Sequence, residues 1–112
     1  MENNEIEKSK ALIIVEIIEY ILNSIVIKTI IKKSTGNISV ISFDTGEVLT
    51  EKINPYDTFI QIIDGKAEII IDGHSNFLDT GQSIIIPAHV SNIVKANIRF
   101  KMISTIIKNI NE

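Results

Sequence analysis

The stretch that decides the fold runs from Gly46 to Ala96, and its centre reads Ile60-Gln-Ile-Ile-Asp-Gly65-Lys-Ala-Glu-Ile-Ile-Ile-Asp-Gly73. Two apolar runs here each end in Asp-Gly. Each of the two Asp-Gly dipeptides predicts a tight hairpin turn, because glycine accepts the positive φ that such turns require. Further short apolar runs follow on both sides at intervals of roughly 8–12 residues, with turn residues between them. The pattern predicts an all-β antiparallel barrel or sandwich.

The strands expected outside this centre are also short and rich in β-branched residues. They cover residues 25–33, 38–43, 77–78, 83–87, 93–94 and 100–107. No internal repeat and no linker divides the chain. We therefore expect residues 1–9 to form a flexible tail and residues 10–112 to form one domain.

The region before the first of these strands has a different period. Glu16 and Glu19 lie three residues apart, while isoleucines fill the positions that would form the opposite side of a helix. This spacing predicts a brief strand over residues 11–14, followed by a short amphipathic helix that ends near Asn23 and Ser24.

Composition excludes several classes of function. The chain has 112 residues, a formal net charge of −3 and scattered lysines, so it lacks the basic surface of a nucleic-acid-binding protein. Zero cysteines exclude disulfides, thiolate metal sites and cysteine nucleophiles. The N-terminus is acidic rather than signal-like, and Glu16 and Glu19 interrupt the longest apolar stretch. We expect a soluble cytoplasmic protein without membrane or nucleic-acid partners.

Two spaced patterns occupy the ends of the deciding stretch. In the first, two glycines enclose three polar positions, in the order Gly46, Lys52, Asn54, Thr58 and Gly65. The second pattern consists of Gly81, Pro87, His89, Asn92 and Ala96. The intervals resemble the two motifs of the cupin barrel, and the likeness extends over about residues 35–107. In the family the first motif is glycine, five residues, His-x-His, three or four residues, Glu, six residues, glycine. The second motif is glycine, five residues, Pro-x-Gly, two residues, His, three residues, Asn.

The resemblance implies a small cupin-like antiparallel β-barrel, or jelly roll, with a pocket at its open end and the short helix as an N-terminal addition. In the family, three histidines and a glutamate hold a divalent metal in this pocket. Here those four positions are Lys52, Asn54, Thr58 and Asn92. A charged lysine has no lone pair to donate, and neutral amide and hydroxyl oxygens are poor ligands for iron, nickel or zinc. We therefore expect no transition metal and no other cofactor.

The same four residues are the candidate ligand-binding set, and none of them is predicted to be catalytic. Lys52 would offer a positive charge to an anionic molecule, and Asn54, Thr58 and Asn92 would exchange hydrogen bonds with a polar one. The alternatives are a lysine on the surface and a polar plug in which Asn54, Thr58 and Asn92 bond to one another and to backbone. His89 takes the glycine position of the motif rather than a ligand position, which favours a structural or interface role.

The leading prediction for function is a small-molecule binding or sensing domain without enzymatic activity. The alternatives are a cupin enzyme, an isomerase or dioxygenase with an atypical metal site, and a structural or regulatory dimer without a ligand. Both faces of the segments 59–63 and 84–86 are apolar, which is more than one small barrel can bury by itself. We expect a homodimer.

Overall fold

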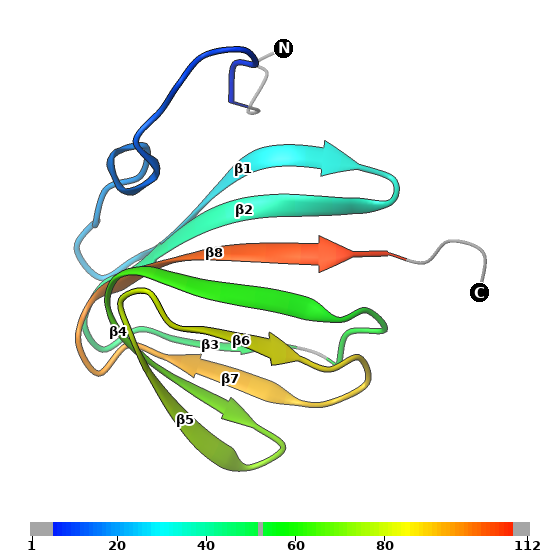
Figure 1. Cartoon of the computed structure of the whole chain (residues 1–112). Coiled ribbons are helices and arrows are strands. Elements are labelled where there is room, and N and C mark those ends of the chain that lie inside the picture. Colours follow the sequence, from blue (N-terminus) through cyan, green and yellow to red (C-terminus); the bar gives the residue numbers. More distant parts are fainter. Residues whose placement is uncertain (1–5, 52, 109–112) are drawn as a thin grey trace.

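The computed structural model describes residues 6–51 and 53–108. Nearly all of the regular structure is β-strand (Figure 1). The elements in chain order are a 3-10 turn η1 (Ile14–Glu16) and the strands β1 (Ile25–Lys33), β2 (Gly36–Phe43), β3 (Val48–Glu51), β4 (Thr58–Ile71), β5 (His74–Asp79), β6 (Ser83–Ile86), β7 (Asn92–Lys95) and β8 (Phe100–Ile107). The prediction of an all-β fold is confirmed. No helix in the described part of the chain is long and apolar enough to cross a membrane.

The strands pair in antiparallel fashion and curl into two facing sheets. Sheet A contains β1, β2, β8, the first half of β4, and β6. Sheet B contains β3, β7, the second half of β4, and β5. Figure 1 shows both sheets diverging from one end, where β4 passes from sheet A to sheet B.

That passage occurs at Asp64-Gly65, where the expected hairpin turn is wrong. β4 continues through this pair without reversing, and its register against β8 shifts between Ile62 and Asp64. Gly65 has φ of +84°, and a Cβ there would overlap the backbone carbonyl oxygen of Arg99. The pair therefore forms a bulge that bends the strand, a conformation that glycine permits. Asp72-Gly73, in contrast, does form the predicted hairpin between β4 and β5, with φ of +49° and +79°.

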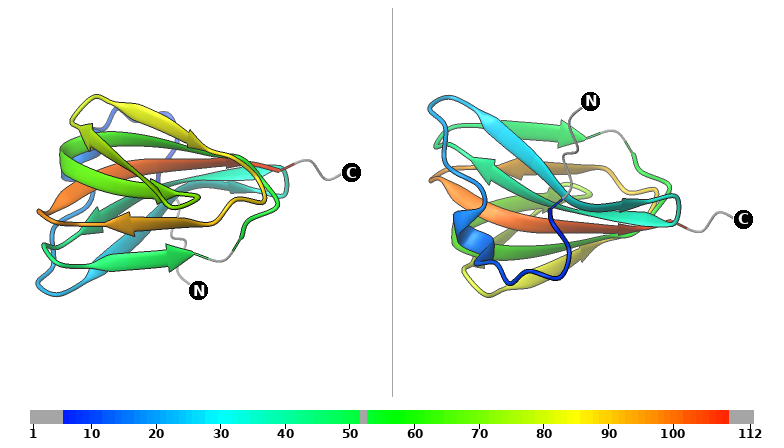
Figure 2. Two further views of the ribbon diagram at one scale, coloured as in Figure 1. Left: turned by 90° about the horizontal axis from the view of Figure 1, so that it is seen from below. Right: turned by 90° about the horizontal axis from the view of Figure 1, so that it is seen from above.

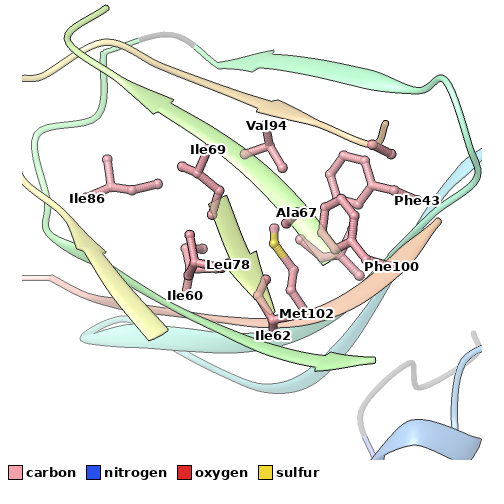
Figure 3. Close-up of a cluster of buried hydrophobic side chains, with 12 residues drawn as sticks. Phe43, Ile60, Ile62, Ala67, Ile69, Leu78, Ile86, Val94, Phe100 and Met102 are labelled. Atoms are coloured by element: carbon pink, nitrogen blue, oxygen red, sulfur yellow. The ribbon is translucent and has the colours of Figure 1, made fainter. Parts of the chain in front are cut away.

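The hydrophobic core fills the space between the two sheets (Figure 3). The rings of Phe43 and Phe100 stack with their centroids 4.6 Å apart, and neither residue is exposed. Their strands pair at this point, so the two rings lie on the same face of sheet A. The other core residues are Ile41, Ile60, Ile62, Ala67, Ile69, Leu78, Ile86, Val94, Ala96 and Met102.

The predicted N-terminal helix and the strand before it are wrong. Residues 14–24, which we call the strap, contain only the 3-10 turn and cross the outer face of sheet A (Figure 2). The carbonyl oxygen of Val15 accepts a hydrogen bond from Lys101 Nζ at 2.6 Å, and that of Glu19 accepts one from Ser42 Oγ at 2.8 Å. Bonds to the sheet replace bonds within a helix, and the β-branched residues of the strap have low helix propensity.

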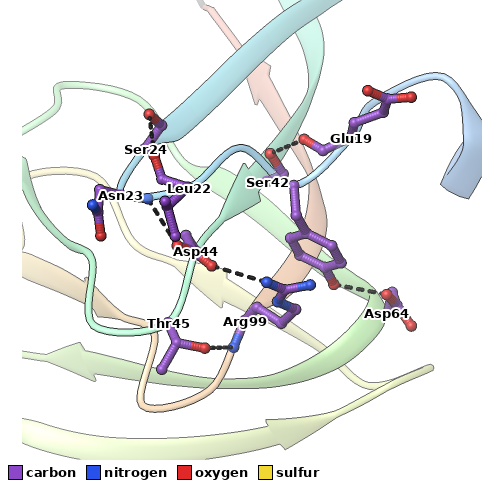
Figure 4. Close-up of polar contacts among 10 residues, drawn as sticks. Glu19, Leu22, Asn23, Ser24, Ser42, Asp44, Thr45, Asp64 and Arg99 are labelled. Atoms are coloured by element: carbon purple, nitrogen blue, oxygen red, sulfur yellow. Dashed lines mark hydrogen bonds and ion pairs between the residues drawn. The ribbon is translucent and has the colours of Figure 1, made fainter.

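Polar contacts hold the C-terminal part of the strap against the end of the barrel (Figure 4). Tyr20 donates a hydrogen bond to Asp64 at 2.7 Å, and its ring lies within 5 Å of both the Arg99 guanidinium and the Lys101 ammonium. Arg99 also pairs with Asp44 at 3.3 Å. Asp44 accepts a hydrogen bond from the backbone N–H of Asn23, and this bond is the main cause of its lowered pKa.

Candidate functional site

The inner face of the barrel is polar toward the end where the sheets diverge. Thr58 begins β4 and pairs with Ile86, a core residue, so its side chain lies on the same inner face. Asn92 begins β7 and pairs with Ile71, which packs against the core. Both polar residues are buried, at 7% and 4% exposure. The structure thus places two of the predicted site residues inside the open end of the barrel.

Asn92 has an unusual environment among them. Its side-chain oxygen Oδ1 is buried and has no hydrogen-bond partner among the residues that the structure describes. A buried polar atom without a partner typically costs roughly 1–3 kcal/mol, and native structures contain few of them. An atom of this kind calls for a donor that the described residues do not supply, such as a water molecule or a ligand.

Asn54 lies in the loop before β4 and is used differently. Its side-chain oxygen accepts a hydrogen bond from the backbone N–H of Tyr56 at 2.9 Å, and its carbonyl oxygen accepts one from the N–H of His89 at 2.7 Å. The oxygen atoms of Asn54 therefore shape the rim by connecting two loops. Lys52 lies outside the described residues, and the structure does not place it relative to the others.

Three further polar residues on the same inner face escaped the sequence analysis. Ser39 pairs with Ser104, and Asn37 pairs with Ile106, which is itself opposite Thr58. Ser104 is buried. The only signal for these residues is strand alternation, since Ser39 lies two positions before the core residue Ile41. That signal is weak here because isoleucine occupies both faces of the neighbouring strands.

The inner face of the barrel is also open to solvent along β1. Ile27 pairs with the core residue Ile41 and so lies on the inner face, yet it is 60% exposed. Strands β1 and β3 are the two ends of the hydrogen-bonded strand order and do not pair with each other. Solvent therefore reaches the inner face from the side of β1.

His89 has φ of +65° at the motif position where the family has glycine. Its backbone thus adopts a left-handed conformation, at a steric cost that glycine would not have. The residue is exposed at the rim.

We expect His89→Gly to raise the free energy of unfolding by about 0.5–1 kcal/mol, because relief at positive φ outweighs the added freedom of the unfolded chain. His89→Val should lower it by more than 1 kcal/mol, since a β-branched residue tolerates this conformation poorly. Urea unfolding of the three proteins measures the order. Equal stability of the glycine and valine variants would contradict the left-handed conformation of this residue.

The residues at the family's metal position do not fit a transition metal. Thr58 and Asn92 offer neutral oxygen atoms, and the side-chain oxygen of Asn54 is already engaged by Tyr56. Over residues 6–51 and 53–108, no three histidine, aspartate or glutamate side chains come together in a way that could hold a metal ion. Iron, nickel and zinc in proteins prefer imidazole, thiolate or carboxylate ligands, so this donor set is unsuitable.

Comparison with known proteins defines the class. No protein-family model matches the chain, and no curated protein matches its sequence. Among solved structures, a conserved protein of unknown function from Streptococcus pyogenes superimposes with a TM-score of 0.88 at 28% identity, over 96% of this chain and 93% of the other. A cupin superfamily protein from Desulfitobacterium hafniense gives a TM-score of 0.86 at 25% identity, over 96% and 97%. A cupin 2 conserved barrel domain protein from Leptotrichia buccalis gives 0.81 at 28% identity, over 84% of this chain and 46% of the other.

The chain therefore has the fold of the cupin superfamily, and the resemblance inferred from the two motifs is confirmed. It is a cupin-like domain in which the four positions of the family's metal ligands carry Lys52, Asn54, Thr58 and Asn92.

Proposed function

We propose that the open end of the barrel binds a small polar organic molecule and that the domain acts as a binding or sensing module rather than as an enzyme. The observation that carries the proposal is the buried Oδ1 atom of Asn92 on the inner face, which has no hydrogen-bond partner in the described part of the chain. A ligand that donates a hydrogen bond to this oxygen would remove the cost of leaving it unpaired.

The other polar side chains on the inner face, together with Lys52 in the sequence, indicate which chemistry such a ligand needs. Thr58 and Ser104 offer hydroxyl groups that can either donate or accept, and Asn37 adds an amide on the same face. Lys52 follows β3 by one residue in the sequence, and its ammonium would favour a carboxylate or another anionic group. The expected ligand therefore carries at least one hydroxyl or amine and is neutral or anionic.

Asn92→Leu provides the test. The variant removes the unpartnered acceptor at similar volume, so we expect the ligand-free protein to gain roughly 1 kcal/mol, or about 4 °C in melting temperature. Ligands found by a thermal-shift screen of metabolite carboxylates and polyols should bind the variant roughly 10- to 100-fold more weakly, as measured by titration calorimetry. Higher stability combined with lost binding is expected only of a residue that serves a ligand.

Lys52→Met tests the anionic part of the proposal separately. The change keeps the length of the side chain and removes its charge, so binding of small carboxylates should weaken by about 10- to 100-fold. Lys66→Met is the matched control, because Lys66 is an exposed lysine paired with Asp79 in sheet B. A screen in which wild type, Asn92→Leu and Lys52→Met respond alike to every compound would contradict the proposal.

The alternative of a cupin enzyme with an atypical metal site predicts a different result. Elemental analysis of protein purified without chelators would then find stoichiometric iron, manganese, nickel or zinc. The third alternative, a structural or regulatory dimer, predicts that no compound shifts the melting temperature of the wild-type protein.

A further inference from the structure

A β-bulge reverses the direction of the side chains in the second half of β1. Thr29 pairs with Ser39 and Ile31 pairs with Ile38, so β1 advances by two residues where β2 advances by one. Ile30 is the extra residue of the bulge. Because successive side chains of a strand alternate between its two faces, one extra residue moves every later side chain to the opposite face.

This reversal places Lys32 on the inner face of the barrel. Lys28, before the bulge, points outward, and its Nζ atom donates a hydrogen bond to the carbonyl oxygen of Ile17 in the strap at 3.3 Å. Unbroken alternation would put Lys32 on the same outer face, since the two lysines are four positions apart. In the structure Lys32 instead pairs with Asn37, which lies on the inner face in the same cross-strand row as Thr58.

The next row on the inner face consists of hydroxyl groups. Thr29 pairs with Ser39, and Ser39 pairs with Ser104 in β8. Ser104 in turn pairs with the core residue Ile60, so the hydroxyl row lies between the side of β1 and the core. A cation at β1 with hydroxyl groups beside it is complementary to a molecule that carries a carboxylate and several hydroxyl groups.

We propose that Lys32 binds the anionic group of the ligand, and that this ligand is a hydroxylated carboxylate whose carboxylate lies beside β1. This role of Lys32 rests on the proposed function, because it applies only if the open end of the barrel binds a small molecule. Bulges in other proteins re-aim side chains next to functional sites in the same way. Lys32 already interacts within the chain, and the ligand shares its ammonium group, which has three N–H donors.

Lys32→Met and Lys33→Met are the matched variants that test this role. Both remove one positive charge from an exposed position of β1, but Lys33 comes one residue later and lies on the outer face. Circular dichroism checks that both variants are folded. The probes are three hydroxy acids, each paired with the alcohol in which a hydroxymethyl group replaces the carboxylate: glycerate with glycerol, threonate with threitol, and gluconate with sorbitol. Titration calorimetry measures each affinity.

In wild type and in Lys33→Met, at least one acid should bind about 10-fold more tightly than its alcohol. Lys32→Met should weaken the binding of that acid by about 10-fold and leave the alcohol unchanged. Equal binding of the acid by wild type and Lys32→Met, or an equal loss in Lys33→Met, would overturn the role of Lys32. Alcohols that bind as tightly as their acids, or a lack of binding by all three acids, would overturn the ligand class.

The proposed function fails in a different way. It fails if no compound of the wider thermal-shift screen binds wild type, or if Asn92→Leu binds every compound as wild type does. A ligand that is lost in Asn92→Leu but retained in Lys32→Met would therefore support the binding site and contradict the anionic role of Lys32.

Discussion

Phe100→Ala should lower the free energy of unfolding by about 4 kcal/mol. Phe100 is fully buried and stacks on Phe43, so truncation removes both its own burial and the partner of the second ring. Large-to-small changes of buried phenylalanine typically cost 3–5 kcal/mol, because the surrounding structure closes the cavity only in part. Urea unfolding followed by circular dichroism measures the difference.

Phe77→Ala is the control for this change, since the same truncation at a side chain that is 73% exposed should stay within about 0.5 kcal/mol of wild type. A loss of less than 2 kcal/mol in Phe100→Ala would show that the converging end of the barrel repacks around the missing ring. The stacked pair would then be less important for stability than its burial indicates.

Gly65→Ala should cost about 3–4 kcal/mol, which is far more than an alanine usually costs. Two effects add at this position. An L-residue at φ of +84° is strained, and the new Cβ would overlap the backbone of Arg99 and crowd Phe100. Neither neighbour can move aside as a flexible side chain would, because both contacts involve backbone atoms at the start of β8.

Gly81→Ala separates the two effects. Gly81 also has positive φ, at +92°, but a Cβ there would meet no atom within 4 Å. Only the backbone strain remains, so we expect a loss of about 1 kcal/mol in urea unfolding. Equal losses at Gly65 and Gly81 would contradict the role of Gly65 as the point where β4 passes close to the start of β8.

The candidate site could be predicted in part. The motif intervals located Thr58 and Asn92, which the structure places on the inner face. The same intervals grouped Asn54 with them, whereas its side-chain oxygen is engaged in the rim loop. Intervals count residues along the chain and cannot tell which polar atom already has a partner. Ser39 and Ser104 were missed because they come from β2 and β8, outside the stretch that contains the two motifs.

By itself the sequence determined most of the strands, though not β3, together with the Asp72-Gly73 hairpin and the class of fold, because alternation and turn chemistry act between near neighbours. Tertiary structure decided the rest. Asp64-Gly65 is the same dipeptide as Asp72-Gly73, yet it became a bulge because β4 pairs with β8 as far as Gly65 and continues from Lys66 onward by pairing with β5 and β7. The strap is extended rather than helical because Lys101 and Ser42, distant in sequence, bind its carbonyl groups. Intrinsic helix propensity contributes only tenths of a kcal/mol per residue to the free energy of folding. Hydrogen bonds and packing with distant strands therefore decide the local conformation.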